Sequence, residues 1–204
     1  MPLDAGVRSR LCKSNGYTAV ELLMVIAIAA IAAGISMPML ARTNGDLKLQ
    51  NDARAIHNMV SLAKMRAATR SARVRFFADL GSETFYLQWY DRANAKWVTE
   101  DGSRTLSANI DFGHGSASTP PPSTQSAIDA VKLCRDDAGT TEIPNTACVV
   151  FNSRGIPVNH LGEPDGNAGF YLTDGTGVYG VTVSATPLVR LWWTPASKSA
   201  WTHK

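Results

Sequence analysis

Residues 17–40 read YTAVELLMVIAIAAIAAGISMPML, and this stretch decides the fold. Its single charged side chain belongs to Glu21. About 20 apolar residues in a helix cross the ~30 Å hydrocarbon core of a bilayer, so the segment predicts a transmembrane helix. A carboxylate inside such a helix is costly unless it is paired, and Glu21 therefore indicates a functional role.

The residues before this stretch are polar, and their charged side chains are mostly basic. Residues 1–16 read MPLDAGVRSRLCKSNG, with three basic residues and one aspartate. Basic flanks favour the cytoplasmic side, so the rest of the chain is expected to be exported. A secretory signal would need a small-residue cleavage site at the end of the apolar run, yet the run continues past 30–34 to Leu40. A plain membrane anchor leaves Glu21 unexplained.

Gly16, the YTAVE motif at 17–21 and the apolar run together resemble the processing signal of type IV pilins and type II secretion pseudopilins. The resemblance implies that a prepilin peptidase cuts after Gly16, on the cytoplasmic side, and methylates the new amine of Tyr17. It also makes Glu21 the family's acidic residue near the mature N-terminus and Pro38 its helix-kinking proline. Tyr17 departs from the usual phenylalanine.

The same residues have a physical logic of their own. A glycine at the scissile bond has no Cβ and fits a tight active site. Cleavage would free an ammonium at Tyr17, one helical turn from Glu21. In a bundle of staggered helices, Glu21 of one subunit would pair with that ammonium on its neighbour, because an unpaired charge in a low dielectric is expensive. Glu21 would then set the register of a helical polymer.

The chain therefore divides into a cleaved leader (1–16), a transmembrane and polymerisation helix (17–40), an amphipathic continuation (41–72) and a β-rich domain (73–204). Pro38 should kink the helix rather than end it, and the helical pattern resumes after 43–45. Apolar residues then recur at spacings of four and three, which predicts one buried stripe. The stripe consists of Leu49, Ala53, Ile56, Val60, Ala63 and Ala67.

A helix followed by many short strands predicts an α+β fold, with the long helix packed on an antiparallel β-sheet domain. Strands are expected at 74–78, 84–90, 148–151, 169–173, 178–183 and 188–193, and weaker ones at 97–98 and 105–106. A hairpin should turn at 174–177. The low-complexity stretch 113–126 predicts an exposed, irregular loop. This layout resembles the GspH/FimT-type branch of minor pilins and pseudopilins.

The chain contains three cysteines, Cys12, Cys134 and Cys148. If the leader is removed, Cys12 leaves with it, and Cys134 and Cys148 remain as a pair. A disulfide between them would add about 3 kcal/mol by restricting the unfolded chain, and it would indicate an oxidising compartment such as the periplasm. Two free buried thiols are the alternative.

Catalytic and metal-binding patterns are scarce. The four histidines show no metal-ligand spacing, and no nucleotide-binding loop or hydrolase motif is present, so we expect neither an enzyme nor a cofactor. Two acidic groups carry the oxygen donors that calcium prefers, although neither matches an EF-hand. These groups are Glu163, Asp165 and Asn167, and Asp136, Asp137 and Glu142.

A basic cluster lies at the C-terminal end of the amphipathic helix. It comprises Lys64, Arg66, Arg70, Arg73 and Arg75, and the tail adds Arg190 and Lys198 among tryptophans. Cations suit the C-terminal end of a helix dipole. Mixed with aromatic residues, they also hold single-stranded nucleic acid. Some minor pilins of this branch bind DNA, but of their C-terminal signature only Arg190 matches. The tail tryptophans would alternatively pack on the sheet or on a neighbouring subunit.

Two functions follow from these observations. The first is a minor pilin or pseudopilin that assembles into, or primes, a type IV pilus or a type II secretion pseudopilus. Its expected partners are other pilin or pseudopilin subunits, a prepilin peptidase and an inner-membrane assembly platform. It would cross the inner membrane once, with its C-terminal domain in the periplasm. The alternative is a pilus-associated receptor that binds DNA during natural transformation.

Overall fold

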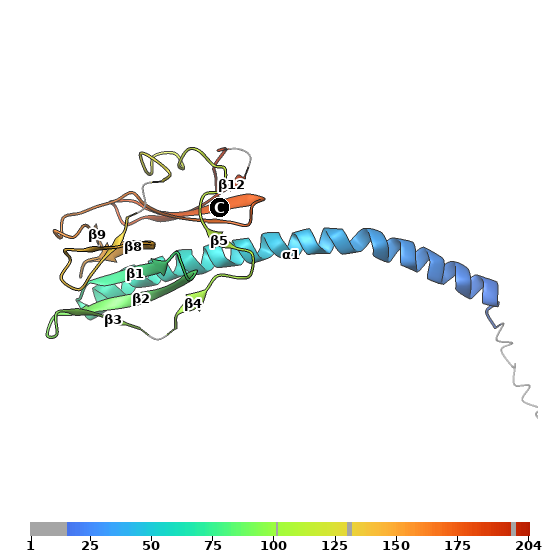
Figure 1. Cartoon of the computed structure of the whole chain (residues 1–204), viewed down its shortest axis with the longest axis horizontal. Coiled ribbons are helices and arrows are strands. Elements are labelled where there is room, and N and C mark those ends of the chain that lie inside the picture. Colours follow the sequence, from blue (N-terminus) through green and yellow to red (C-terminus); the bar gives the residue numbers. More distant parts are fainter. Residues whose placement is uncertain (1–15, 101, 130–131, 197–198) are drawn as a thin grey trace, which may run out of the picture. The chain divides into compact units, whose positions relative to one another are not determined.

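The computed structural model describes residues 16–100, 102–129, 132–196 and 199–204, without the side chains of 36–43. The chain forms two compact units, the first ending at Arg42 and the second spanning Thr43–Lys204. Figure 1 shows the long helix α1 and the strands of the second unit, which together make an α+β fold.

The helix α1 spans Ala19–Arg70 as a single element. The sequence predicts a continuation to residue 72, but the helix ends earlier because Ser71 adopts a positive φ of 49°. The N–H groups of Ser71 and Ala72 donate to the carbonyls of Ala68 and Ala67, each at 3.3 Å. This is the Schellman arrangement, which satisfies the last carbonyl groups of a helix.

No break separates the two halves of α1. The sequence predicts that the helical pattern resumes after 43–45, yet the helix passes through these residues. A glycine in a helix costs only about 1 kcal/mol, which the packing of the following turns outweighs. Pro38 does not end the helix, in agreement with the prediction. Its predicted kink concerns residues whose side chains lie outside the described part, and it stays a prediction.

The predicted apolar stripe is buried in the core of the second unit. All six of its residues are at most 2 % exposed, and they pack against side chains from both large sheets. The rings of Phe76 and Phe170, one from each sheet, meet edge-to-face at 4.8 Å. The stripe therefore lies in one core that both sheets share.

The first sheet, called sheet A here, has the strand order β3-β2-β1-β8-β9, with β4 paired to β2. Its neighbouring strands are antiparallel. The predicted strands within it are confirmed. The strands are β1 (Val74–Asp79), β2 (Thr84–Asp91), β3 (Lys96–Thr99), β4 (Arg104–Thr105), β8 (Thr146–Phe151) and β9 (Pro157–Val158).

The second sheet, sheet B, has the order β13-β12-β11-β10-β5. The predicted hairpin at 174–177 is confirmed, because Thr173 of β10 pairs with Val178 of β11. The strand predicted at 188–193 corresponds to β12. It is not the final strand of the chain, because β13 follows it and pairs with it. The strands are β5 (Asp111–Phe112), β10 (Ala168–Thr173), β11 (Gly177–Val183), β12 (Val189–Pro195) and β13 (Thr202–His203).

The outer face of each sheet is covered by a connecting segment. A small hairpin of β6 (Cys134–Arg135) and β7 (Glu142–Ile143) covers sheet A, where the two disulfide cysteines pack on Phe77. The loop 113–128 covers sheet B, where a second apolar cluster forms. That cluster consists of Ala117, Ile128, Tyr171 and Val178, with Trp201 packed against it.

The low-complexity stretch 113–126 is irregular, as predicted, and seven of its 14 residues are exposed, but some of the others are buried against sheet B. Ala117 is 2 % exposed and Gln125 is 8 % exposed. The Tyr171 hydroxyl donates a 2.5 Å hydrogen bond to Gln125 Oε1, and Trp201 Nε1 donates to the carbonyl of Thr119 at 2.7 Å. Small and polar residues are buried here because the outer face of sheet B offers apolar side chains for packing and the Tyr171 hydroxyl for hydrogen bonding.

Candidate functional site

The N-terminal end of α1 carries a defined cap. Thr18 precedes the first helical residue, and its hydroxyl oxygen accepts a 3.2 Å hydrogen bond from the backbone N–H of Glu21. Residues 18–21 read TAVE, which is the capping-box pattern. A carboxylate in the first turn also interacts favourably with the helix dipole. Gly16 and Tyr17, the predicted processing residues, lie just before this cap and are exposed.

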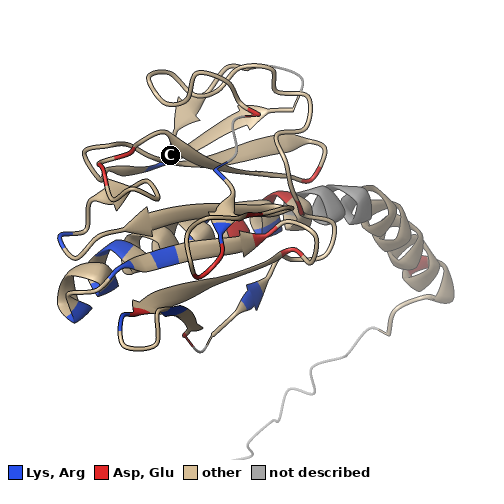
Figure 2. Ribbon diagram, turned by 60° about the vertical axis from the view of Figure 1, so that its left-hand side comes forward, with Lys and Arg blue, Asp and Glu red and all other residues tan. Residues whose placement is uncertain are grey.

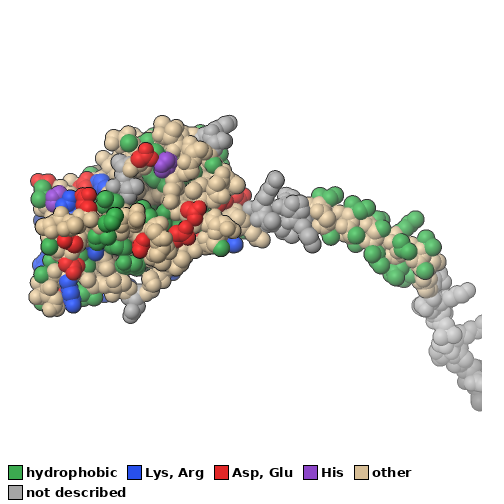
Figure 3. All heavy atoms as spheres, viewed as in Figure 1, with side chains coloured by type: hydrophobic (Ala, Val, Ile, Leu, Met, Phe, Trp, Pro, Cys, Tyr) green, Lys and Arg blue, Asp and Glu red, His purple; other side chains and the backbone are tan. Residues whose placement is uncertain are grey.

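The described part of α1 before residue 36 presents apolar side chains to its surroundings on every side. Val20, Leu23 and Ile28 are 67 %, 70 % and 68 % exposed, and Figure 3 shows the hydrophobic side chains along this segment in green. A helix that is apolar all round needs a non-aqueous or protein environment. Within the part of the chain that the structure describes, no helix meets the length and hydropathy of a membrane span.

The predicted disulfide is present. Cys134 and Cys148 are bonded, with their Cα atoms 5.0 Å apart. Cys134 opens β6 and Cys148 lies in the centre of β8, so the bond fastens the β6–β7 hairpin to sheet A. The backbone N–H of Cys148 also donates to the carbonyl of Lys132 at 2.8 Å. Cys12 lies outside the described residues.

Part of the predicted basic cluster is engaged within the second unit. Arg66 Nη1 lies 2.6 Å from Glu100 Oε2, and Arg70 Nη2 lies 3.0 Å from Glu100 Oε1. Lys64 Nζ donates to the carbonyl of Pro187 at 3.0 Å. Figure 2 shows these basic residues around the last turns of α1. They join the end of the helix to neighbouring segments.

Arg73 and Arg75 lie on the outer face of sheet A instead. The guanidinium of Arg73 lies over the Tyr90 ring, 4.3 Å from its centroid. Arg75 is 4 % exposed, so it is not the surface cation that the sequence predicts. Burial lowers the pKa of Arg75 to about 10, which leaves it charged at neutral pH. Its Nε donates to Gln88 Oε1 at 2.7 Å.

The tail does not join the basic residues of α1 into one described surface. Arg190 is exposed on β12, and Lys198 lies outside the described residues. Trp192 Nε1 donates to Thr182 Oγ1 at 2.9 Å, and Trp201 packs on Tyr171. These two tryptophans therefore pack on sheet B, as the alternative interpretation of the tail predicts.

The two acidic groups considered for calcium are used in other ways. Asp165 Oδ1 lies 2.6 Å from Lys132 Nζ, and the Glu163 carboxylate accepts from the Asn159 amide at 3.0 Å. Asp136 accepts from the backbone N–H groups of Thr140 and Thr141. Among the described residues, no group of three or more histidine, cysteine or acidic side chains is placed to hold a metal ion.

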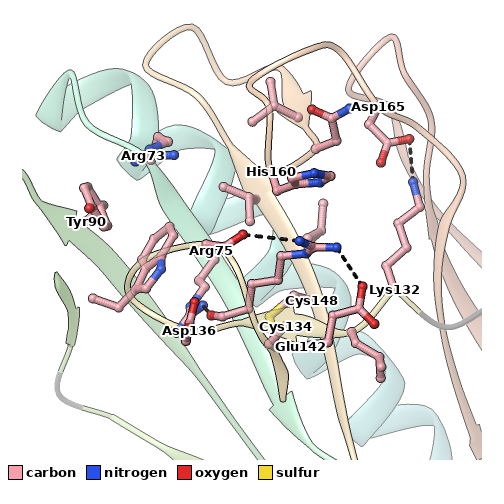
Figure 4. A pocket seen from close by; sticks show the side chains of 18 of the residues that line it. Arg73, Arg75, Tyr90, Lys132, Cys134, Asp136, Glu142, Cys148, His160 and Asp165 are labelled. Atoms are coloured by element: carbon pink, nitrogen blue, oxygen red, sulfur yellow. Dashed lines mark hydrogen bonds and ion pairs between the residues drawn. A yellow bond between two sulfur atoms is a disulfide. The ribbon is translucent and has the colours of Figure 1, made fainter. Parts of the chain in front are cut away.

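A pocket of about 400 Å³ opens on the outer face of sheet A, beside the disulfide hairpin. Figure 4 shows Arg73 and Tyr90 on one side of it, with Lys132, Asp165 and His160 on the other. Sequence reasoning singled out both arginines but not Lys132 or His160. Lys132 is held beside the pocket by its hydrogen bond to β8, and His160 follows β9, which pairs with β8. Contacts between segments this far apart in the chain leave no local pattern in the sequence.

Comparison with known proteins places this chain in a family. The chain is 30 % identical over 141 residues to the pilin-like protein PilA1 of Thermus thermophilus, covering 69 % of this chain and 88 % of that protein. The chain belongs to the type IV pilin-like proteins. It is accordingly a pilus or pseudopilus subunit, which assembles with other pilin-like subunits. No family model matches the chain.

Two solved structures also align with this pilin-like chain. Both are the minor pseudopilin EpsH from the type 2 secretion system of Vibrio cholerae. One is 12 % identical with a TM-score of 0.43, covering 74 % of this chain and 99 % of that one. The other is 10 % identical with a TM-score of 0.42, covering 71 % and 92 %.

The pilin-like chain therefore presents two separate features. The first is the capped, apolar start of α1 with Glu21 in its first turn. The second is the pocket on sheet A, whose lining includes Arg73 and Arg75.

Proposed function

We propose that this pilin-like chain is a minor subunit that primes or joins a type IV pilus or a type II secretion pseudopilus after cleavage behind Gly16. The observation that carries the proposal is the fully apolar surface of the start of α1, interrupted by the carboxylate of Glu21. Such a surface is stable in a bilayer or in a bundle of similar helices. We propose that residues 17–40 occupy both environments in turn.

In this proposal Glu21 pairs with the freed, methylated amine of Tyr17 on a neighbouring subunit. Both residues are exposed in the single chain, so both are available to a neighbour. The low dielectric of an apolar bundle strengthens such a pair and makes an unpaired carboxylate costly. Stacking out of register would leave Glu21 unpaired, and the pair would therefore select one stagger between subunits.

The proposed cellular setting follows from the same features. A prepilin peptidase and an inner-membrane assembly platform would act on the N-terminal segment, with the second unit in the periplasm. The disulfide between Cys134 and Cys148 supports this placement, because such bonds persist in oxidising compartments.

We also propose a structural rather than a catalytic role. The described aspartates with lowered pKa values have local structural causes. Backbone and side-chain groups of Ser82 and Gly81 donate to Asp79 and lower its pKa, and hydrogen bonds from Asn94 and Ala93 do the same for Asp91. These carboxylates close turns, and that accounts for their shifts without a reaction.

A DNA receptor is the less supported alternative. Arg66 and Arg70 both pair with Glu100, and Arg75 is almost fully buried. Phosphate binding needs clustered cations that are free to meet a backbone. Two of the basic residues named for that role are thus paired within the domain, and a third is too buried to lie along an extended phosphate backbone.

The register hypothesis and the helix cap make opposite predictions for Glu21→Gln. Glutamine keeps the capping box but carries no charge. If Glu21 pairs with an ammonium, Glu21→Gln will insert and be cleaved normally yet lose most of its incorporation into filaments, counted by immuno-electron microscopy. Mass spectrometry of the same samples should find a methylated Tyr17 as the first residue.

The matched control is Thr18→Ala, which removes the cap and keeps the charge. It should cost helix stability by about 1 kcal/mol and leave incorporation close to wild type. Normal incorporation of Glu21→Gln would overturn the register hypothesis. A native chain that still begins at Met1 would overturn the processing step.

A further inference from the structure

The pocket on sheet A contains two arginines that lie on the same side of one strand segment. Side chains alternate across a strand, so Arg73 and Arg75 share a face, whereas Val74 between them points into the core. Tyr90 and Trp97 lie beside them, with the guanidinium of Arg75 4.3 Å from the Trp97 ring centroid. The two cations thus lie in an aromatic setting that partly excludes water.

Arg75 is bonded to neutral acceptors only. Its Nε donates to Gln88 Oε1 at 2.7 Å and its Nη1 to the carbonyl of Arg135 at 2.6 Å. No carboxylate of the described residues lies within 4.0 Å of its guanidinium, and its Nη2 has no hydrogen-bond partner among them. A cation this deeply buried normally has a bonded counter-charge.

Arg73 is in a similar state. It is half-buried over the Tyr90 ring and, within the described part of the chain, forms no ion pair. The other cations of the pocket differ, because Lys132 pairs with Asp165 and Arg135 pairs with Glu142. The pocket therefore has two guanidinium groups without a bonded carboxylate beside two neutralised pairs, and Asp137 acts on Arg75 only through its charge, from beyond ion-pair distance.

We propose that this pocket binds a carboxylate side chain carried by an acidic segment of another polypeptide, held between Arg73 and Arg75 against Trp97 and Tyr90. Guanidinium groups match the planar carboxylate with paired hydrogen bonds. A volume of about 400 Å³ has room for one or two side chains. This inference does not depend on how the N-terminal helix assembles.

The same pocket is a poor match for a nucleic-acid backbone. Its lining also contains Asp136 and Asp137, which carry negative charge next to the two arginines. A chain of phosphates needs a continuous track of cations, whereas these carboxylates interrupt it. A single carboxylate needs only the two guanidinium groups. The charge pattern therefore favours an acidic peptide over a polynucleotide.

The test is calorimetric titration of the full-length chain in detergent micelles. Acetyl-Gly-Glu-Glu-Gly-amide is the probe, acetyl-Gly-Gln-Gln-Gly-amide is its neutral match, and a short oligothymidylate represents nucleic acid. The acidic peptide should bind at least about tenfold more tightly than the amide peptide. Arg73→Gln should weaken the acidic peptide by a similar factor, while Arg154→Gln, an exposed arginine outside the pocket, should not.

Arg75→Gln is the more direct variant, but Arg75 is buried and its replacement could unfold the chain. A thermal melt of Arg75→Gln therefore checks that the variant is folded, and the binding result of Arg73→Gln decides the test. Equal binding of the two peptides, or no binding of the acidic one, would overturn the proposal. So would unchanged binding by Arg73→Gln, or an oligothymidylate that binds more tightly than the acidic peptide and depends on Arg73.

Discussion

At the scale of single residues, several charged side chains have local structural roles that can be predicted only partly from the sequence. The TAVE pattern at 18–21 predicts a helix cap, and the structure shows its hydrogen bond from the Glu21 N–H to the Thr18 hydroxyl. The basic residues at the end of α1 were predictable from the helix dipole. Glu100, their shared partner, was not, because it follows β3 and meets Arg66 and Arg70 only when the sheet packs on the helix. Local sequence patterns identify a charged side chain but not the distant residue with which it forms an ion pair.

Glu100→Gln should lower the free energy of unfolding by about 1–3 kcal/mol, because it removes the buried carboxylate that two partly exposed guanidinium groups share. Chemical denaturation monitored by circular dichroism would measure the change.

Glu83→Gln is the matched control for this substitution. The hydrogen bond and the repulsion between Glu83 and Asp111 raise the pKa of Glu83, so removing its charge relieves a like-charge contact. It should not destabilise the fold. An equal loss of stability in both variants would show that the charge of Glu100 is not what matters.

At the scale of helices and strands, the longer elements were predicted from the sequence and most of the shortest ones were not. The stripe of α1 and the six-residue or longer strands were visible as periodic patterns. The two-residue strands β5, β6, β7, β9 and β13 were not, since the alternation typical of a strand is recognised only over about four to eight residues. Their pairing depends on partners far away in the chain. The β6–β7 hairpin is such a case, held in place by Cys134–Cys148.

Replacing both Cys134 and Cys148 by serine should lower the free energy of unfolding by about 3 kcal/mol. The bond closes a loop with a sequence separation of 14, and restricting such a loop in the unfolded chain gives a stabilisation of that size. Urea denaturation with and without a reductant measures it. The reductant should shift the wild-type midpoint and leave that of the double variant in place. A reductant that shifts neither protein would contradict a stabilising role for the bond.

At the scale of the whole second unit, the sequence predicted one helix packed on a sheet. The structure has two large sheets around the same core, and a separate two-stranded sheet of β6 and β7. Which strand joins which sheet depends on long-range pairing. The loop 113–128 illustrates the limit of composition. Its proline, serine and threonine residues are typical of an exposed loop, yet Ala117, Gln125 and Ile128 are buried on sheet B. A polar segment is buried when its partners supply hydrogen bonds, and those partners are invisible in the segment itself.

Ile128→Ala should loosen this loop and expose it to protease. Ile128 is 4 % exposed in the cluster with Tyr171 and Val178, so its truncation should cost about 2 kcal/mol. Limited proteolysis mapped by mass spectrometry should show faster cleavage within 113–128.

Leu161→Ala gives the comparison, because Leu161 is 70 % exposed and its loss should change stability by less than about 0.5 kcal/mol. If Ile128→Ala and Leu161→Ala were cleaved within 113–128 at the same rate, the loop would not depend on this cluster.

The two segments that cover the sheets each contact a different tryptophan. Trp97 lies against Arg75 and binds the hairpin through its backbone N–H, which donates to Asp137 at 2.9 Å. Trp201 lies on Tyr171 and donates to Thr119. Indole emission responds to the polarity and charge around the ring. A chain that keeps one of these indoles and has phenylalanine in place of the others would report, without any added dye, when that particular cover lifts.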